Sequence, residues 1–232
     1  MPGEGSLDPE LCAALSALDS ATDKNLKEKP ILDASGEVRG FWSTASLYVK
    51  IGVRHILPAG QDHILFVLAL FLSSTRLRAL VIQISTFTVA HTASLGLAAA
   101  GVISPASGIV EPLIAVTIAW VAIENLFLPD MPKWRPVIVF MFGLIHGLGF
   151  AGFFGELGLP PGQFWSALIG FNLGVELGQL SVIAVAFVLA LLLRNALAKR
   201  DKSALYRKYV VIPGSTLIGL TGLWWAVSRT FL

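Results

Sequence analysis

Six long apolar runs, separated by short polar or proline- and glycine-containing breaks, constrain this chain more than any other feature. We place them at about 45–73, 77–100, 107–128, 135–157, 163–194 and 208–231. A helix of about 20 residues crosses the roughly 30 Å hydrocarbon core of a bilayer, so each run is long enough to span a membrane. Only 14% of the residues are charged, against about 25% in a typical soluble domain. The sequence therefore predicts an all-α, polytopic bundle of about six transmembrane helices with the lipid bilayer as its surroundings.

Two of these runs depart from a simple span. Pro58 and Gly60 interrupt the first run, which predicts a kink or a half-helix that follows a re-entrant segment. The fifth run, 163–194, is longer than a bilayer requires, so we expect it to tilt or to project beyond the membrane.

Basic residues lie on one side of the predicted bundle. The connections 101–106 and 158–162 contain no lysine or arginine. The alternate connections and their flanks carry ten, namely Arg76, Arg78, Lys133, Arg135, Arg194, Lys199, Arg200, Lys202, Arg207 and Lys208. Positively charged loops stay in the cytoplasm, so we expect both termini outside the cytoplasm, in a bacterial inner membrane.

The first 44 residues differ in composition from the transmembrane domain at 45–232. They hold eight of the fifteen acidic residues and are too few to bury a core of their own. We expect a short amphipathic helix at about 9–20 and a segment that could meet a protein partner outside the cytoplasm. The net charge of +2 gives no support to a nucleic-acid partner.

Ionisable residues inside the spans need a reason, because a charge at the bilayer centre costs about 2.5–3.5 kcal/mol even on insertion scales. Counting along each span puts five of them at one depth, in the middle-to-outer part of the membrane: Asp62, His63, His91, His146 and Glu176. Glu124, which precedes Asn125, lies nearer the cytoplasm. A single such residue is often only a hydrogen-bond partner between helices, but a whole layer of them favours a site.

Helical spacing gives this layer supporting residues. Thr88 shares a face with His91, and Asn172 and Gln179 share one with Glu176. Glycines in the fourth and fifth runs predict close helix packing, and we expect them to bring 135–157 and 163–194 together around His146 and Glu176.

Imidazoles with carboxylates suit Ni²⁺, Co²⁺ or Zn²⁺. The chain has one cysteine, Cys12, and three methionines without a ladder pattern, which disfavours a Cu(I) pathway. Asp62 and His63 are adjacent and point about 100° apart on a helix. We therefore expect one of them to bind the metal and the other to orient it or to serve a neighbouring site.

Several motifs together resemble those of the HupE/UreJ family over about residues 50–180. They are Gly52-Val53-Arg54-His55-Ile56 with Gly60-Gln61-Asp62-His63-Ile64-Leu65-Phe66, then Phe87 to Leu95, Glu124-Asn125, the glycine-flanked His146, and Phe171 to Gln179. The resemblance implies a nickel/cobalt permease-like secondary transporter with about six spans, of the branch with an extracytoplasmic N-terminal region. It also implies that His55 belongs to the metal site. In the family pattern that histidine is seven residues before the next one, whereas here His55 is eight before His63.

These observations lead to one main hypothesis and two alternatives. The main hypothesis is a permease for Ni²⁺ or Co²⁺, with His63, His91, His146 and Glu176 as ligands and Asp62 in support. The first alternative is an intramembrane zinc-dependent hydrolase that uses the same cluster, with a metal-bound water and a carboxylate base. The second is a membrane sensor of metal or protons whose N-terminal region meets a partner.

Overall fold

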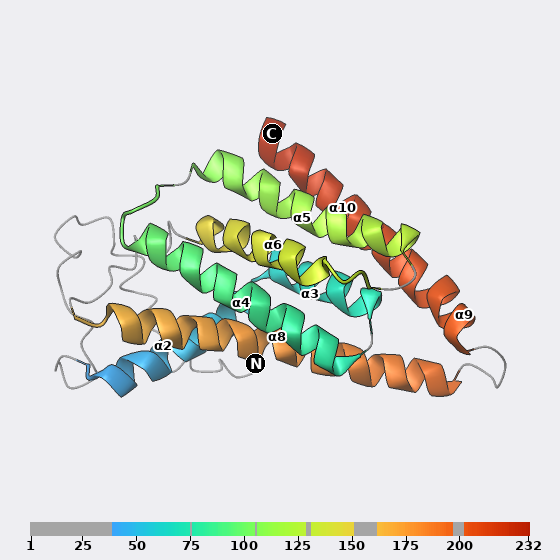
Figure 1. The fold of residues 1–232 in the computed structure, drawn as a ribbon, viewed down its shortest axis with the longest axis horizontal. Helices are drawn as coiled ribbons and strands as arrows, with labels where there is room; N and C mark the ends of the chain where they lie inside the picture. The colour runs from blue at the N-terminus through green and yellow to red at the C-terminus, as the bar shows by residue number, and fades with distance from the viewer. Residues whose placement is uncertain (1–38, 75, 105, 129–130, 151–161, 197–201) are drawn as a thin grey trace, which may run out of the picture.

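The structure, a computed structural model, describes residues 39–74, 76–104, 106–128, 131–150, 162–196 and 202–232. The described part is all-helical (Figure 1). Its helices are α2 (Phe41–Ile56), α3 (Gln61–Ser73), α4 (Leu77–Ala99), α5 (Ser107–Phe127), α6 (Arg135–Gly149), α8 (Phe164–Ala196), α9 (Lys202–Tyr206), the π-helical turn η2 (Arg207–Val211) and α10 (Ile212–Phe231). The helix expected at about 9–20 lies outside the described residues.

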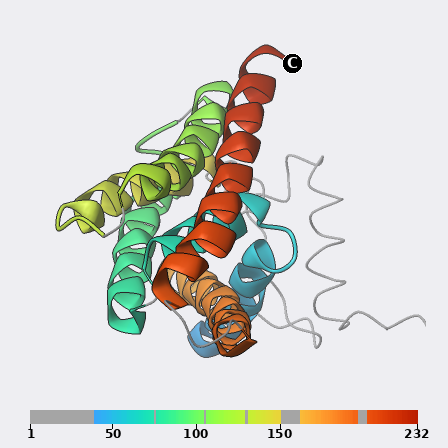
Figure 2. The ribbon, with the colours of Figure 1, turned by 90° about the vertical axis from the view of Figure 1, so that its right-hand side faces the viewer.

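Three helix pairs form the body of the molecule. α5 packs against α10, α4 against α6, and α2 against α8, and these pairs follow one another from top to bottom in Figure 1. The short helix α3 lies among them and contacts α5, α8 and α10. Figure 2 shows the same helices from the side, with α3 between the pairs. α3 therefore carries its side chains into the centre of the bundle.

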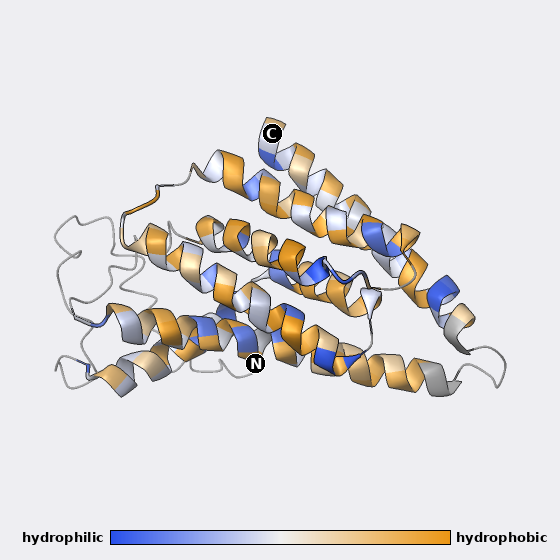
Figure 3. Ribbon diagram, in the orientation of Figure 1, coloured by the Kyte–Doolittle hydropathy of each residue, from blue (hydrophilic) through white to orange (hydrophobic). Residues whose placement is uncertain are grey.

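The prediction of an all-α membrane bundle is confirmed. Four helices are long and apolar enough to cross a bilayer, and the α2–α3 pair adds a fifth if it counts as one span, bent by 73° at the break 57–60. α6 is apolar but has only 15 residues and ends at Gly149. The rest of the expected run 135–157, from residue 151 on, lies outside the described residues. Large apolar side chains such as Trp120, Leu173 and Leu217 are exposed, and Figure 3 shows apolar residues along much of the length of the long helices. Such a surface suits lipid and not water.

Glycines set the closest helix contacts, although not between the expected partners. Gly170, Gly174 and Gly178 of α8 face α2, where a Cβ at Gly174 would meet the Val49 carbonyl oxygen and lie 2.9 Å from the Cα of Gly52. Gly143 and Gly147 of α6 face α4, where a Cβ at Gly143 would lie 2.6 Å from the Phe87 carbonyl oxygen. The expectation that these stripes join the fourth and fifth runs is wrong. Both are packing surfaces, but each belongs to a different pair.

The α2–α8 contact generates a stability prediction. Gly174→Ala forces two backbones apart, and overpacking of this kind costs about 1–3 kcal/mol, so the midpoint of thermal unfolding in detergent should fall. The matched control is Gly108→Ala, because nothing lies within 4 Å of a Cβ at that glycine of α5. Its midpoint should stay unchanged or rise slightly, since alanine favours a helix over glycine. Equal midpoints for the two variants would contradict the contact.

Candidate functional site

The break between α2 and α3 brings His55 beside His63. The last turn of α2 ends at Ile56, and the chain folds back so that the Gly60 amide donates to the Ile56 carbonyl at 3.1 Å. A Cβ at Gly60 would meet the His55 carbonyl oxygen, so only glycine fits this close approach. The rings of His55 and His63 lie 4.9 Å apart, edge to face. A continuous helix with an eight-residue spacing would not have paired them so directly.

Three histidine rings gather around the ring of His63. Its ring centroid lies 5.1 Å from that of His146 and 5.7 Å from that of His91, in addition to the contact with His55. One ring nitrogen from each of His55, His63 and His91 can be chosen so that all three lie within 4.8 Å of one another. His63, His91 and His146 are buried, and His55 is half-buried. The structure therefore unites all four histidines of the chain, from α2, α3, α4 and α6.

Asn172 fixes which nitrogen His91 can offer. The Asn172 side-chain amide donates to the Leu168 carbonyl at 2.8 Å, so its oxygen faces Nδ1 of His91 at 2.9 Å. An amide oxygen only accepts, so Nδ1 carries the proton and the lone pair lies on Nε2. Nε2 is buried without a hydrogen-bond partner among the described residues. This is how a second residue usually orients a metal-binding imidazole.

Thr117 does the same for His146, with the nitrogens reversed. The Thr117 hydroxyl donates to the Ile114 carbonyl at 2.7 Å and lies 2.8 Å from Nε2 of His146. Because its only hydrogen is used, the hydroxyl accepts from Nε2–H, and the lone pair of His146 lies on Nδ1. Within the described part of the chain Nδ1 has no hydrogen-bond partner, as is also true of Nε2 of His55 and of His63. All four rings thus have a nitrogen available to a cation.

Phenylalanines enclose the histidines. Phe66, Phe87 and Phe142 each lie one helical turn from a histidine of the same helix, and Phe66 is 5.1 Å from Phe87 and 6.2 Å from Phe142 between ring centroids. On another side, Phe150 stacks on Phe171 at 4.9 Å, and His55 lies 4.0 Å from Phe150. Apolar walls lower the local dielectric and strengthen any electrostatic contact made inside them.

Asp62 lies next to His63 in sequence but is paired elsewhere. Both of its carboxylate oxygens accept from Arg229 of α10, at 2.9 and 3.1 Å. Arg229 also donates to the Glu111 carbonyl at 3.3 Å and stacks over the Trp225 ring at 5.0 Å. The Asp62 side chain is 26% exposed. The carboxylate thus ties α3 to α10 and lies outside the group of three histidines.

Glu176 is also outside that group. It is half-buried and accepts from the Ser85 hydroxyl of α4 at 2.6 Å. One turn away the Thr88 hydroxyl donates to the Gln179 side-chain oxygen at 3.5 Å. These contacts join α4 to α8, so Thr88, Glu176 and Gln179 form an interhelical polar seam beside the histidines.

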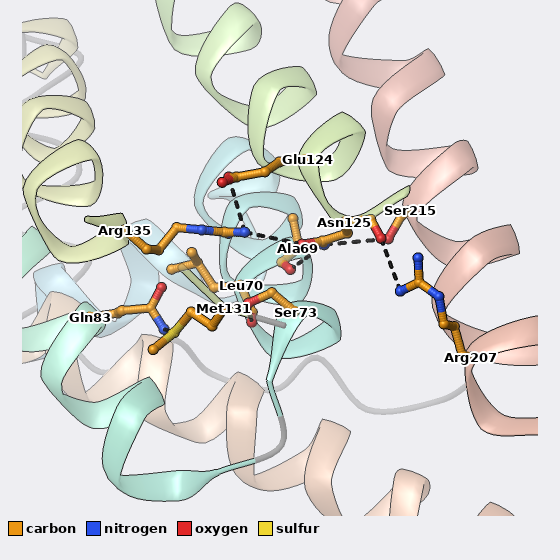
Figure 4. Close-up of polar contacts among 10 residues, drawn as sticks. All are labelled: Ala69, Leu70, Ser73, Gln83, Glu124, Asn125, Met131, Arg135, Arg207 and Ser215. Atoms are coloured by element: carbon orange, nitrogen blue, oxygen red, sulfur yellow. Dashed lines mark hydrogen bonds and ion pairs between the residues drawn. The ribbon is translucent and has the colours of Figure 1, made fainter. Parts of the chain in front are cut away.

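A second polar cluster lies at one end of the bundle (Figure 4). At this end α3 and α5 finish, at Ser73 and Phe127, and α4 and α6 begin, at Leu77 and Arg135. We call this end the basic end, because Arg76 and Lys133 lie in its loops. Glu124 and Arg135 form an ion pair there at 3.0 Å.

Asn125 holds three helices together at the basic end. Its side-chain nitrogen donates to the Ala69 carbonyl at 2.8 Å and reaches Ser215 of α10 at 3.4 Å. Arg207 donates to the carbonyls of Asn125 and Leu126 at 3.3 and 3.0 Å, which caps the C-terminal end of α5 with a positive charge. Asn125 and Glu124 therefore belong to the basic end and not to the histidine layer.

Sequence reasoning missed the partners of the charged residues. The sequence pattern places Arg135 only among the basic residues of a connection, yet its side chain is 1% exposed. Arg229 was not assigned any role. Its position one helical turn after Trp225 on a span end was the available signal, because an arginine there can lie along an aromatic ring.

Comparison with known proteins agrees with the resemblance. No curated protein and no solved structure matches the chain significantly. The family model described as HupE / UreJ protein matches residues 33–229, which is most of the chain and reaches every helix described above except for the last two residues of α10. The chain therefore belongs to the HupE/UreJ family, whose members are known as membrane metal transporters.

Proposed function

We propose that this protein carries a divalent transition metal, Ni²⁺ or Co²⁺, across the membrane through a site made by His55, His63 and His91, with His146 adjacent. The observation that carries the proposal is that one ring nitrogen from each of these three histidines lies within 4.8 Å of the others. In addition, Nε2 of each has no hydrogen-bond partner among the described residues. Imidazole is a borderline ligand that suits Ni²⁺, Co²⁺ and Zn²⁺. Membership of the family supports nickel or cobalt.

The positions of the two carboxylates favour transport over the zinc hydrolase. A hydrolase of the expected kind needs a carboxylate that can act as a base beside the metal-bound water. Asp62 is held in an ion pair with Arg229, and Glu176 accepts from Ser85. The sites of these two residues suit helix packing better than proton transfer at the histidines.

Metal uptake tests the proposal directly. Cells that lack their own nickel and cobalt importers and express this protein should accumulate radiolabelled Ni²⁺ or Co²⁺, and His63→Ala should abolish the gain, because His63 contacts the other three rings. Val116→Ala, a change at a half-exposed residue of α5, serves as the control and should transport normally. Equal uptake by the His63 variant and the control would exclude the proposed site.

Asn172 should tune affinity without contacting the metal. Asn172→Leu removes the acceptor that orients His91, and changes of this kind typically lower metal affinity by about 10–100-fold. Titration of the purified protein with Ni²⁺ measures the change. Asn172→Asp keeps an acceptor at the same place and should retain or raise the affinity. Equal weakening by both variants would show that packing, not ring orientation, is what Asn172 supplies.

Asp62 should act as a tether and not as a ligand. Asp62→Asn leaves Arg229 without its partner and should lower the free energy of unfolding by about 1–3 kcal/mol. The double variant Asp62→Asn with Arg229→Gln removes both charges and should recover much of that loss. Metal stoichiometry, measured by elemental analysis, should be the same in the double variant and the wild type. Less metal bound per protein in the double variant would contradict this and indicate that Asp62 is a ligand.

A further inference from the structure

Glu124 and Arg135 carry two full charges in a nearly water-free place. Their side chains are 7% and 1% exposed, and the nearest nitrogen and oxygen lie 3.0 Å apart. Taking both charges out of water costs about as much as their attraction returns, and apolar side chains of similar size often stabilise a fold equally well. The stability of the fold therefore does not explain why a buried ion pair is found at this place.

The pair lies in line with the histidines along two helices. On α5, Glu124 follows Thr117 by seven residues, which is two turns along the same face and about 10 Å. On α6, Arg135 precedes His146 by eleven residues, which is three turns along the same face and about 16 Å. Thr117 and His146 are bonded to each other. The faces that meet at the histidines thus meet again at the ion pair, nearer the basic end.

An apolar layer separates these two levels. Phe66 and Phe142 lie one turn from His63 and His146 toward the basic end, and their rings are 6.2 Å apart. Val121 lies on α5 between Thr117 and Glu124 and is fully buried. A cation that leaves the histidines for the basic end along these faces would pass the apolar layer first and the ion pair second.

The ion pair is held by few contacts. Within the described ranges, neither oxygen of Glu124 accepts a hydrogen bond, and Nε and Nη1 of Arg135 donate none. One nitrogen, Nη2, approaches both Glu124 and, at 3.5 Å, the Asn125 side-chain oxygen. The Asp62–Arg229 pair differs, since two nitrogens of Arg229 bind two oxygens of Asp62. Contacts through a single nitrogen leave the Glu124–Arg135 pair able to separate when water or a cation arrives.

We propose that the Glu124–Arg135 ion pair is the gate at the basic end of the transport path. In the closed state Arg135 is paired with the Glu124 carboxylate, and the positive charge of Arg135 repels a cation from the passage. In the open state the two separate, and the Glu124 carboxylate receives the divalent cation that has left the histidines. The assignment of the cation rests on the proposed function, whereas the existence of the gate does not.

Thiol accessibility tests the gate without any metal. The chain has one cysteine, so Cys12→Ser gives a cysteine-free background in which Val121→Cys reports on the layer behind the ion pair. A positively charged, membrane-impermeant methanethiosulfonate reagent, added to membrane vesicles from the basic-end side, should label Val121→Cys slowly in an otherwise unchanged protein. Glu124→Gln combined with Arg135→Gln leaves no unpaired buried charge and should raise the labelling rate at least roughly tenfold, as expected when the closed state loses about 1.4 kcal/mol.

Charge exchange and a matched charge removal complete the design. Glu124→Arg combined with Arg135→Glu rebuilds the pair in the opposite sense and should restore slow labelling. Lys133→Gln removes a positive charge from the same connection at an exposed position and should leave labelling slow. Lys133→Cys should react rapidly in every background, which identifies the vesicles whose basic end faces the reagent.

The outcomes separate the gate from the metal proposal. A labelling rate at Val121→Cys that stays slow in the double glutamine variant, with the protein monodisperse after purification, would overturn the gate. Fast labelling in that variant together with restored protection in the exchanged pair would establish it. If the protein with Glu124 and Arg135 intact shows no uptake of Ni²⁺ or Co²⁺, the metal proposal fails and the gate stands on its own evidence.

Discussion

Close backbone contact between paired helices is the constraint on which the histidine cluster depends. α2 and α8 approach at Gly52 and Gly174, and α4 and α6 approach at Gly143 and Gly147. Lipid offers no hydrophobic force between helices, so such contacts rest on dispersion between small residues that fit closely. The first pair sets the height of His55 at the end of α2, and the second sets His91 and His146 side by side. α3 then needs only to enter between the pairs for His63 to contact all three.

Hydrogen bonds from two neighbouring side chains fix the protonation of the histidine rings. Asn172 and Thr117 each use up a donor on a backbone carbonyl of their own helix, which forces the remaining oxygen to accept from a histidine. Asn172 and Thr117 thereby determine which ring nitrogen carries the proton in His91 and in His146. In a dry interior an unmet donor or acceptor costs about 1–3 kcal/mol, so the unpartnered nitrogens of the four histidines are costly unless a ligand uses them.

Much of this arrangement could be predicted from the sequence, and the failures share a physical cause. The apolar runs gave the helices, and counting along them gave the common depth of His63, His91 and His146. Depth carries no information about the direction of a side chain across the bundle, so the expectation that Asp62 and Glu176 join the histidines stays a prediction, and the structure pairs them with Arg229 and Ser85. The glycine stripes were recognised, but which helix faces which depends on the whole set of contacts. His55 depended on the backbone path at Gly60, which helical periodicity cannot describe.

Charge balance follows from the ligands that the structure brings together. The described donor group has three imidazoles, and the nearby Asp62 is already neutralised by Arg229. A divalent ion seated there would keep its full +2 charge in a low-dielectric interior, which is costly without an anion beside it. The gain from the nitrogen ligands must therefore exceed the lost hydration of the ion. Neutral ligands alone leave the charge of the ion uncompensated, so an anion that accompanies the ion, or a carboxylate that comes within reach of it, would lower the cost of holding it there.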